Sequence, residues 1–253
     1  MLLCCFSIPA YAQVRVSKLI IQSHETYCLD STDILVADSL IMMDSSRIKL
    51  NGLKAENFIR TNVAIIGKHC RIDGRGVAGK KGPDGASGLT PIGPCRDGVS
   101  GRNGFRGLSG GSGINLFFYI DNIHVKGKLI IDLSGGNGGD GGNGGEGGGG
   151  SPGTYHCHGG NGGNGGKGGS GGDGGLGGAL TIGGRDVVIT KALIGNLLII
   201  KNNGGSFGYR GISGIGGSAG LGPNRKNGNA GEKGVEGVYG RPGDSGTVLF
   251  EEQ

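Results

Sequence analysis

The densest group of side chains that could do chemistry is His156-Cys157-His158, with Tyr155 beside it. Imidazole and thiolate are preferred zinc ligands, but adjacent residues rarely complete a tetrahedron, so a metal would need ligands from another part of the chain. The alternatives are a contact surface, or a disulfide flanked by two exposed histidines. We expect the disulfide, with Cys157 bonded to Cys95 in a neighbouring turn, and no metal or other cofactor.

Two glycine-rich motifs match known ligand sites only in part. Residues 74–81 have the spacing of a phosphate-binding P-loop, but Lys81 stands where Ser or Thr must hold magnesium, and the following Gly-Pro prevents the required helix. Residues 135–140 and 168–173 open like a calcium β-roll repeat. Their period is three residues rather than nine, and Gly142 and Gly175 replace the apolar residue of that repeat.

Catalytic groups are scarce in this sequence. His24, His69 and His124 have no recognisable nucleophile nearby, and the acidic residues are dispersed. We therefore expect no enzyme activity. A glycosidase with two paired carboxylates stays open as an alternative, because a pairing in space cannot be read from a sequence.

The N-terminus and the cysteines indicate export. Residues 1–12 form an apolar run that ends in Ala-Tyr-Ala, which fits a secretory signal cleaved before Gln13; a buried first strand is the alternative. Exported proteins favour disulfides, so we expect a second one between Cys28 and Cys70. Without any Asn-X-Ser/Thr acceptor, the expected address is bacterial: secreted, periplasmic or at the cell surface. No later apolar stretch reaches the ~18 residues that span a bilayer.

Composition limits the class of protein. Glycine supplies 63 of 253 residues, which argues against an ordinary enzyme core because glycine buries no side chain and loses the most backbone entropy on folding. Seven prolines are too few for collagen. The net charge is +5, but the basic residues are scattered and no aromatic residues alternate with them, so we expect no nucleic-acid partner.

Three glycine-rich segments share one plan, at residues 74–113, 135–178 and 204–246. Glycine recurs every third residue, and each run is broken near its middle by a stretch that contains proline. We interpret each segment as an out-and-back hairpin of threefold polyproline-II-type helices, whose glycine ridge lets a neighbouring backbone approach and hydrogen-bond. The Gly-Gly-X repeat of the middle segment predicts the most surrounded hairpin, with one solvated polar edge. A flexible linker is the alternative.

The remaining segments are rich in strands. Residues 13–73, 114–134, 179–203 and 247–253 carry short apolar runs with polar corners, and no sustained helical stripe occurs. Within these segments, we expect residues 187–200 to form a strand. We predict an all-β base, a β-solenoid with a sandwich as alternative, in a single unit interleaved with the glycine hairpins.

Runs such as Gly-Gly-Asn-Gly-Gly-Asn-Gly-Gly-Lys-Gly-Gly-Ser at 159–170 resemble the glycine-rich antifreeze proteins of springtails and the tips of some phage tail-fibre adhesins. The resemblance implies polyglycine-II helices packed in a bundle, six of them for three hairpins. The resemblance to the adhesins also implies that turns at the end of the bundle recognise a host.

The leading interpretation is a non-enzymatic structural or adhesive protein whose three turns meet at one tip. Loops on a rigid scaffold commonly bind partners, and we expect a cell-surface glycan or protein receptor. Self-association through exposed apolar residues of the outer hairpins is a further hypothesis. Ice binding is another alternative, although the legs contain no threonine, and so is a carbohydrate-active enzyme with a glycine-rich appendage. The candidate tip residues are Arg96, Tyr155, His156, His158, Asn224, Arg225 and Lys226.

Overall fold

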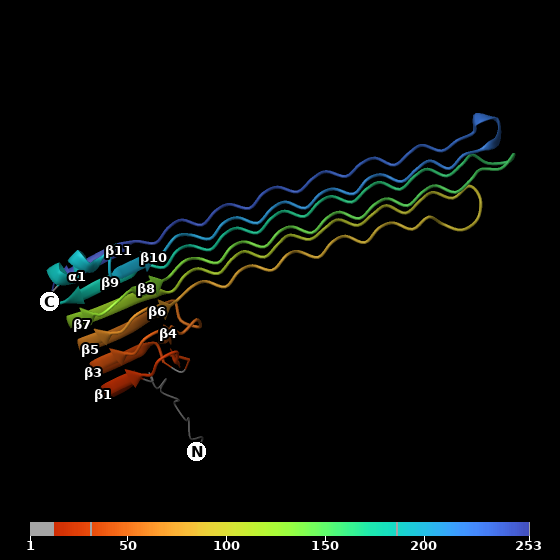
Figure 1. Ribbon diagram of the computed structural model, residues 1–253. Coiled ribbons are helices and arrows are strands. Elements are labelled where there is room, and N and C mark those ends of the chain that lie inside the picture. Colours follow the sequence, from red (N-terminus) through yellow and green to blue (C-terminus); the bar gives the residue numbers. More distant parts are fainter. Residues whose placement is uncertain (1–12, 31, 186, 253) are drawn as a thin grey trace, which may run out of the picture.

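The structure, a computed structural model, describes residues 13–30, 32–185 and 187–252 (Figure 1). The expected signal segment, residues 1–12, lies outside the described residues. The described chain is mostly β-structure in parallel sheets and contains one short α-helix. The predicted all-β class is therefore correct at this level.

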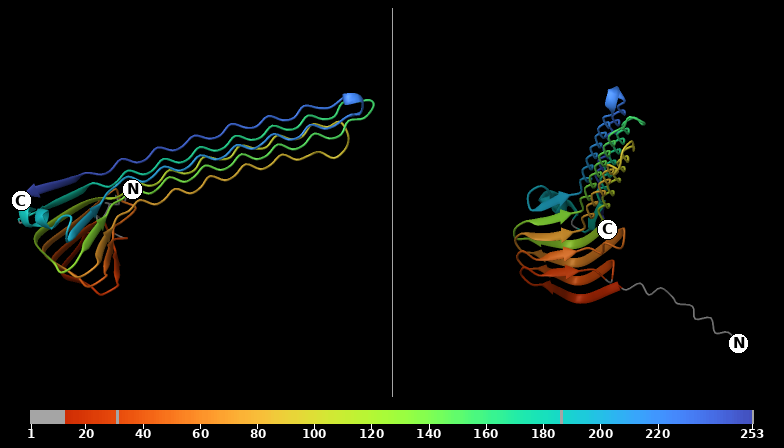
Figure 2. Two further views of the ribbon diagram at one scale, coloured as in Figure 1. Left: turned by 45° about the horizontal axis from the view of Figure 1, so that its top comes forward. Right: turned by 90° about the vertical axis from the view of Figure 1, so that its right-hand side faces the viewer.

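Successive strands alternate between two parallel sheets, so the chain winds repeatedly from one sheet to the other (Figure 2). The first sheet contains, in spatial order, β1 (Gln13–Ile21), β3 (Ile34–Met42), β5 (Glu56–Ile66), β7 (Asn115–Val125), β9 (Leu180–Gly184) and β11 (Val248–Glu252). The second contains β10 (Leu198–Lys201), β8 (Leu129–Asp132), β6 (Cys70–Asp73), β4 (Arg47–Lys49) and β2 (Thr26–Cys28).

The hydrophobic core lies between these sheets. In β3, Leu35 and Ala37 are buried before Asp38, whereas Leu40 and Met42 are buried after it, so the inward alternation changes phase at this residue. Strand pairing skips the same position in β1, β5 and β7. The apolar runs that the sequence shows as separate pieces are thus halves of single long strands that turn a corner at a polar residue.

The expected strand at 187–200 is wrong in its first half. Residues 187–193 form α1 (Val187–Leu193), and only the end of the segment enters β10. Val187 and Thr190 are buried while Val188 and Ile189 are exposed, which is a helical spacing too short to stand out in a β-branched stretch. Gly195, with a φ of +84°, follows the helix and turns the chain toward β10.

The expected Cys28–Cys70 disulfide is also wrong, because both cysteines are free. Strand β4 separates β2 from β6, and Cys28 is in register with Asp73, three residues beyond Cys70, through Lys49. Two strand spacings and three residues of rise put the Cα atoms on the order of 14 Å apart, about twice what a disulfide spans. Cys70 instead is buried, with its Sγ 3.1 Å from the Met43 carbonyl oxygen.

The three glycine-rich segments leave and re-enter the sheets at equivalent places. Hairpin 1 (residues 74–113) runs from β6 to β7, hairpin 2 (135–178) from β8 to β9, and hairpin 3 (204–246) from β10 to β11. The outgoing legs therefore continue the second sheet and the return legs continue the first (Figure 1). Backbone pairing continues from the strands into the legs without a break. Gly74 N–H donates to the Asp132 carbonyl at 2.8 Å, and Gly76 N–H donates to the Ser134 carbonyl at 2.9 Å.

Along the legs, the backbone hydrogen bonds repeat every three residues. In hairpin 1, Gly82 N–H donates to the Asp140 carbonyl at 2.8 Å, and Phe105 N–H donates to the Pro83 carbonyl at 2.9 Å. Hairpin 2 has the most neighbours. Its outgoing leg bonds to both legs of hairpin 1, to its own return leg and to the outgoing leg of hairpin 3. This is the arrangement that two glycine ridges allow.

The polar third ridge of hairpin 2 does more than face solvent. The Oδ1 atoms of Asn137, Asp140 and Asn143 accept hydrogen bonds of 2.8–3.0 Å from backbone N–H groups of hairpin 3. On the return leg, Asn161, Asn164 and Asp173 do the same at 2.8–2.9 Å. Short Asn and Asp side chains reach a neighbouring backbone from this position, so they join the legs from outside as the glycines join them from within.

Candidate functional site

The three turns gather at the end of the hairpins that lies away from the sheets (Figures 1 and 2). We call the turn residues 89–97, 151–158 and 221–227 the tip. Each turn replaces the three-residue glycine repeat with a segment that contains proline, which cannot donate a backbone hydrogen bond.

Covalent and backbone bonds tie the tip into one piece. Cys95 and Cys157 form a disulfide between the first and second turns, with their Cα atoms 6.0 Å apart, as expected. Beside it, Cys95 N–H donates to the Pro152 carbonyl at 2.8 Å. The third turn is joined to the second by Gly153 N–H to the Leu221 carbonyl and Gly159 N–H to the Lys226 carbonyl, both at 2.8 Å.

The candidate residues of the sequence analysis lie on this tip with exposed side chains, as far as they are described. Tyr155 is 76% exposed. Asn224 adopts a φ of +55° in a short 3-10 turn, η1 (Pro223–Arg225), which also contains Arg225. The other exposed candidates are Arg96, His156, His158 and Lys226.

Sequence reasoning missed the apolar part of the tip. Ile92 is 93% exposed in the first turn, where Leu89 is also exposed, and Leu221 is exposed in the third turn. A signal was present, since these large aliphatic residues stand at or within the proline-containing breaks, where no core could cover them. The tip thus combines cations, an aromatic ring and exposed aliphatic groups, a composition suited to contact with another surface.

The His156-Cys157-His158 group is centred on the disulfide. The Cys157 thiol is consumed by the disulfide that His156 and His158 flank. Within the part of the chain that the structure describes, no three His, Cys, Asp or Glu side chains gather as potential metal ligands. Asp97, the acidic residue of the tip, accepts a 2.6 Å hydrogen bond from Asn161 N–H and so has a structural partner.

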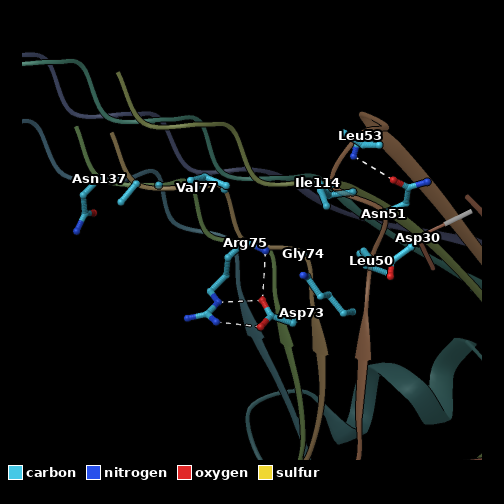
Figure 3. A pocket seen from close by; sticks show the side chains of 16 residues that line it. Asp30, Leu50, Asn51, Leu53, Asp73, Gly74, Arg75, Val77, Ile114 and Asn137 are labelled. Carbon is cyan, nitrogen blue, oxygen red and sulfur yellow. Dashed lines mark hydrogen bonds and ion pairs between the residues drawn. The ribbon is translucent and has the colours of Figure 1, made fainter. Parts of the chain in front are cut away.

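A second candidate lies where hairpin 1 leaves the sheets (Figure 3). A cleft of about 810 Å³ opens beside the corner after β4, with Asn51 and Leu53. Its other side is formed by Asp73 at the end of β6 and by Arg75 and Val77 at the start of the first leg. Arg75 binds Asp73 through two hydrogen bonds of 2.9 Å. In the neighbouring strand, Asp132 is in register with Asp73, so the structure does bring two carboxylates together.

The electrostatics of this cleft favour an ion pair. Burial alone would raise the pKa of Asp73, but hydrogen bonds and charge from Arg75, with the charge of Arg47, outweigh it and leave the pKa below its ordinary value of 3.8. Asp132 Oδ1 accepts a 2.8 Å hydrogen bond from the Ser134 hydroxyl. A glycosidase pair needs one carboxyl group whose pKa is raised so that it can donate a proton, and Asp73 has the opposite shift.

Comparison with other proteins adds no relative: no protein-family model, curated protein or solved structure matches this chain. Among the described residues, no helix has the length and apolar character needed to cross a membrane. The features that bear on function are therefore the geometry of the tip and of the legs that carry it.

Proposed function

We propose that the chain is a β-solenoid with three polyglycine-II hairpins inserted at successive corners and packed as a six-helix bundle. Strands that alternate between two parallel sheets support the first part. Hydrogen bonds repeating every three residues between legs support the second. A flexible linker would need neither this repeat nor the join to the sheet ladders.

In this proposal the bundle is a rigid spacer and the tip is its contact surface. A leg of about 17 residues at ~3.1 Å per residue projects the turns roughly 50 Å from the base. The protein is a non-enzymatic structural or adhesive protein, secreted or displayed on a bacterial surface. The observation that carries the proposal is the joining of all three turns by the Cys95–Cys157 disulfide and by backbone hydrogen bonds. Loops fixed in this way present binding groups at little entropic cost.

The chemistry of the tip suits a cell-surface glycan or a protein receptor. The Tyr155 ring offers an exposed apolar face with a polar hydroxyl, the combination that is enriched in contact surfaces. Arg96 and Lys226 are exposed cations with no ion-pair partner among the described residues. Carboxylates, sulfates or phosphates of a surface ligand would pair with them.

The test is binding of the labelled protein to bacterial and host cell surfaces after substitution of the tip. The triple variant Arg96→Ala, Tyr155→Ala and Lys226→Ala removes three exposed side chains and should abolish binding while the melting temperature stays unchanged. The matched control, Lys80→Ala, Arg102→Ala and Phe105→Ala, removes an exposed lysine, an exposed arginine and an exposed aromatic ring from hairpin 1 and should bind like the native protein. Undiminished binding by the tip variant would refute the role of the tip.

A further inference from the structure

The outer edge of hairpin 3 carries a continuous apolar surface. Tyr209, Ile212 and Ile215 follow one another at every third residue of the outgoing leg and are 63%, 62% and 58% exposed. At the end near the sheets, the rings of Phe207, Tyr209 and Tyr239 contact one another, with centroids 5.8–6.1 Å apart. We call these five residues the hairpin 3 edge.

The backbone beneath this edge has its hydrogen bonds made inside the molecule. The Tyr209 and Ile212 N–H groups donate to the Oδ1 atoms of Asp140 and Asn143 at 2.8 and 3.0 Å. The carbonyls of Tyr209, Ile212 and Ile215 accept from N–H groups of hairpin 2 at 2.8–2.9 Å. Removing water from this edge would therefore leave none of these backbone groups without a hydrogen bond.

Charge distinguishes this edge from the one across the bundle. The ridge of Ser206, Tyr209, Ile212, Ile215, Ser218 and Leu221 contains no charged residue. Beside it, Arg210 is paired with Glu236 and lies 5.0 Å from the centre of the Tyr239 ring. Phe105 and Leu108 belong to hairpin 1, which hairpin 2 separates from hairpin 3, so the exposed apolar residues of the two outer hairpins lie on opposite edges of the bundle. The hairpin 1 ridges also contain Lys80 and Arg102.

We infer that the hairpin 3 edge is the interface of a twofold homodimer in which two bundles lie antiparallel. The large side chains of this ridge recur every three residues, which is about 9 Å along the leg. A partner that packs against the whole ridge must present side chains at the same spacing. A second copy of the same edge has that repeat by construction. Five side chains of this size, each more than a third exposed, offer on the order of 600 Å² per protomer, so the pair would bury on the order of 1,200 Å², within the range of specific interfaces.

The length of the leg fixes the alignment of the two copies. With the twofold axis at Ile212, Tyr209 of each copy faces Ile215 of its partner, and Gly204 lies beside Gly220. The outgoing leg of hairpin 3 in each copy is then covered by the same leg of its partner from Gly204 to Gly220. The two tips point in opposite directions. Such a dimer would present two contact surfaces, which raises avidity for a repetitive ligand without any new contact at the tip.

Sedimentation velocity over a range of protein concentrations tests the interface. The native chain should pass from monomer to dimer, and Ile212→Lys should remain monomeric at every concentration. Leu108→Lys is the matched control, because Leu108 is about equally exposed on the opposite edge, and it should dimerise like the native chain. A native protein that is monomeric throughout, or equal loss of the dimer in both variants, would overturn the inference.

Cysteine cross-linking tests the alignment independently of affinity. In a background of Cys4→Ser, Cys5→Ser and Cys28→Ser, Ile212→Cys should form a covalent dimer on mild oxidation, because the two copies of this position meet at the axis. Tyr209→Cys should not, since its two copies would be about 19 Å apart along the bundle. Cross-linking of Tyr209→Cys in place of Ile212→Cys would contradict the proposed alignment.

Discussion

Gly148 and Gly149 are neighbours in hairpin 2 with opposite surroundings. A Cβ atom on Gly148 would lie 2.2 Å from the carbonyl oxygen of Leu89, a backbone atom that cannot move unless the legs separate. A Cβ atom on Gly149 would meet the hydroxyl groups of Ser218 and Thr90 at 3.2 and 3.4 Å, which can rotate, and the Ser218 carbonyl oxygen at an ordinary contact distance of 3.8 Å. The requirement for glycine is therefore a property of the inward ridges and does not extend to the third position of the repeat.

This difference predicts opposite effects for two adjacent substitutions. Gly148→Ala should destabilise the bundle by about 2–4 kcal/mol, since it adds overpacking and leaves interleg hydrogen bonds unmade. Gly149→Ala should be neutral or stabilise by up to about 1 kcal/mol, because alanine restricts the unfolded chain. Thermal unfolding of the two variants measures this, and equal destabilisation would show that the legs do not pack as described.

Two carboxylates on the bundle surface link its stability to pH. A hydrogen bond from the Asn143 N–H, assisted by Lys81, lowers the pKa of Asp84 below its ordinary value of 3.8. A hydrogen bond from the Arg241 N–H, assisted by the charge of Arg106, lowers the pKa of Asp173 in the same way. Both groups hold a neighbouring leg in their ionised form.

Acid should therefore loosen the bundle. Because both native-state pKa values lie below those of the unfolded chain, the unfolded state binds protons first as the pH falls, and stability decreases below about pH 4. Denaturant unfolding at pH 6 and pH 2.5 should show this loss, and it should be smaller in the double variant Asp84→Asn and Asp173→Asn. An identical acid sensitivity in that variant would mean that these carboxylates do not contribute.

At the scale of elements, the disulfide is the one covalent link between two hairpins among the described residues. It joins residues 62 positions apart, and in the chain-entropy model a loop of this size adds up to about 4 kcal/mol to stability. Cys157→Ser should therefore lower the unfolding midpoint and leave the first and second turns joined by hydrogen bonds alone, so that their amides exchange faster. The legs should remain paired, because their backbone hydrogen bonds do not depend on the sulfur atoms. Amide exchange of the Cys157→Ser chain would measure protection at the turns and in the legs separately. Unchanged protection at the turns would contradict the role of the disulfide.

The elements that could be predicted from the sequence are those that a short stretch of residues determines. Glycine at every third residue and a proline in each break are visible in any short window, and they indicate the hairpins and the place of their turns. Helix α1 escaped prediction because Val187 and Thr190 face the protein over less than two turns, in residues that favour strands. The separation of Cys28 from Cys70 depends on β4 lying between their strands, a long-range fact.

The site was only partly predictable for the same reason. The tip residues could be chosen because they interrupt the repeat. The cleft beside Asp73 could not be predicted, because residues far apart in the sequence form it. They come from the corners after β2 and β4 and from the start of hairpin 1. The two apolar edges also required the order of the hairpins, since Leu108 and Ile212 look alike in the sequence and lie on opposite sides of hairpin 2.

At the scale of the whole molecule, one set of hydrogen bonds runs from the parallel sheets through the legs to the turns. The outgoing legs extend the second sheet, the return legs extend the first, and the turns close the far end. A change that breaks the pairing of the legs should therefore affect the tip, because the position of each turn depends on the pairing that precedes it. The proposed contact surface is a consequence of this continuity.

Hydrogen exchange of the native protein, resolved by residue, tests that continuity most directly. In the outgoing leg of hairpin 1, the amide of Gly76 donates to Ser134, and those of Gly79, Gly82, Gly85 and Gly88 donate to hairpin 2, so about one amide in three should be protected. In hairpin 2, both glycines of each Gly-Gly-X unit donate, so at least two in three should be protected. Protection in this three-residue rhythm is the predicted result. Fast exchange throughout the glycine segments, with protection confined to the strands, would contradict the account.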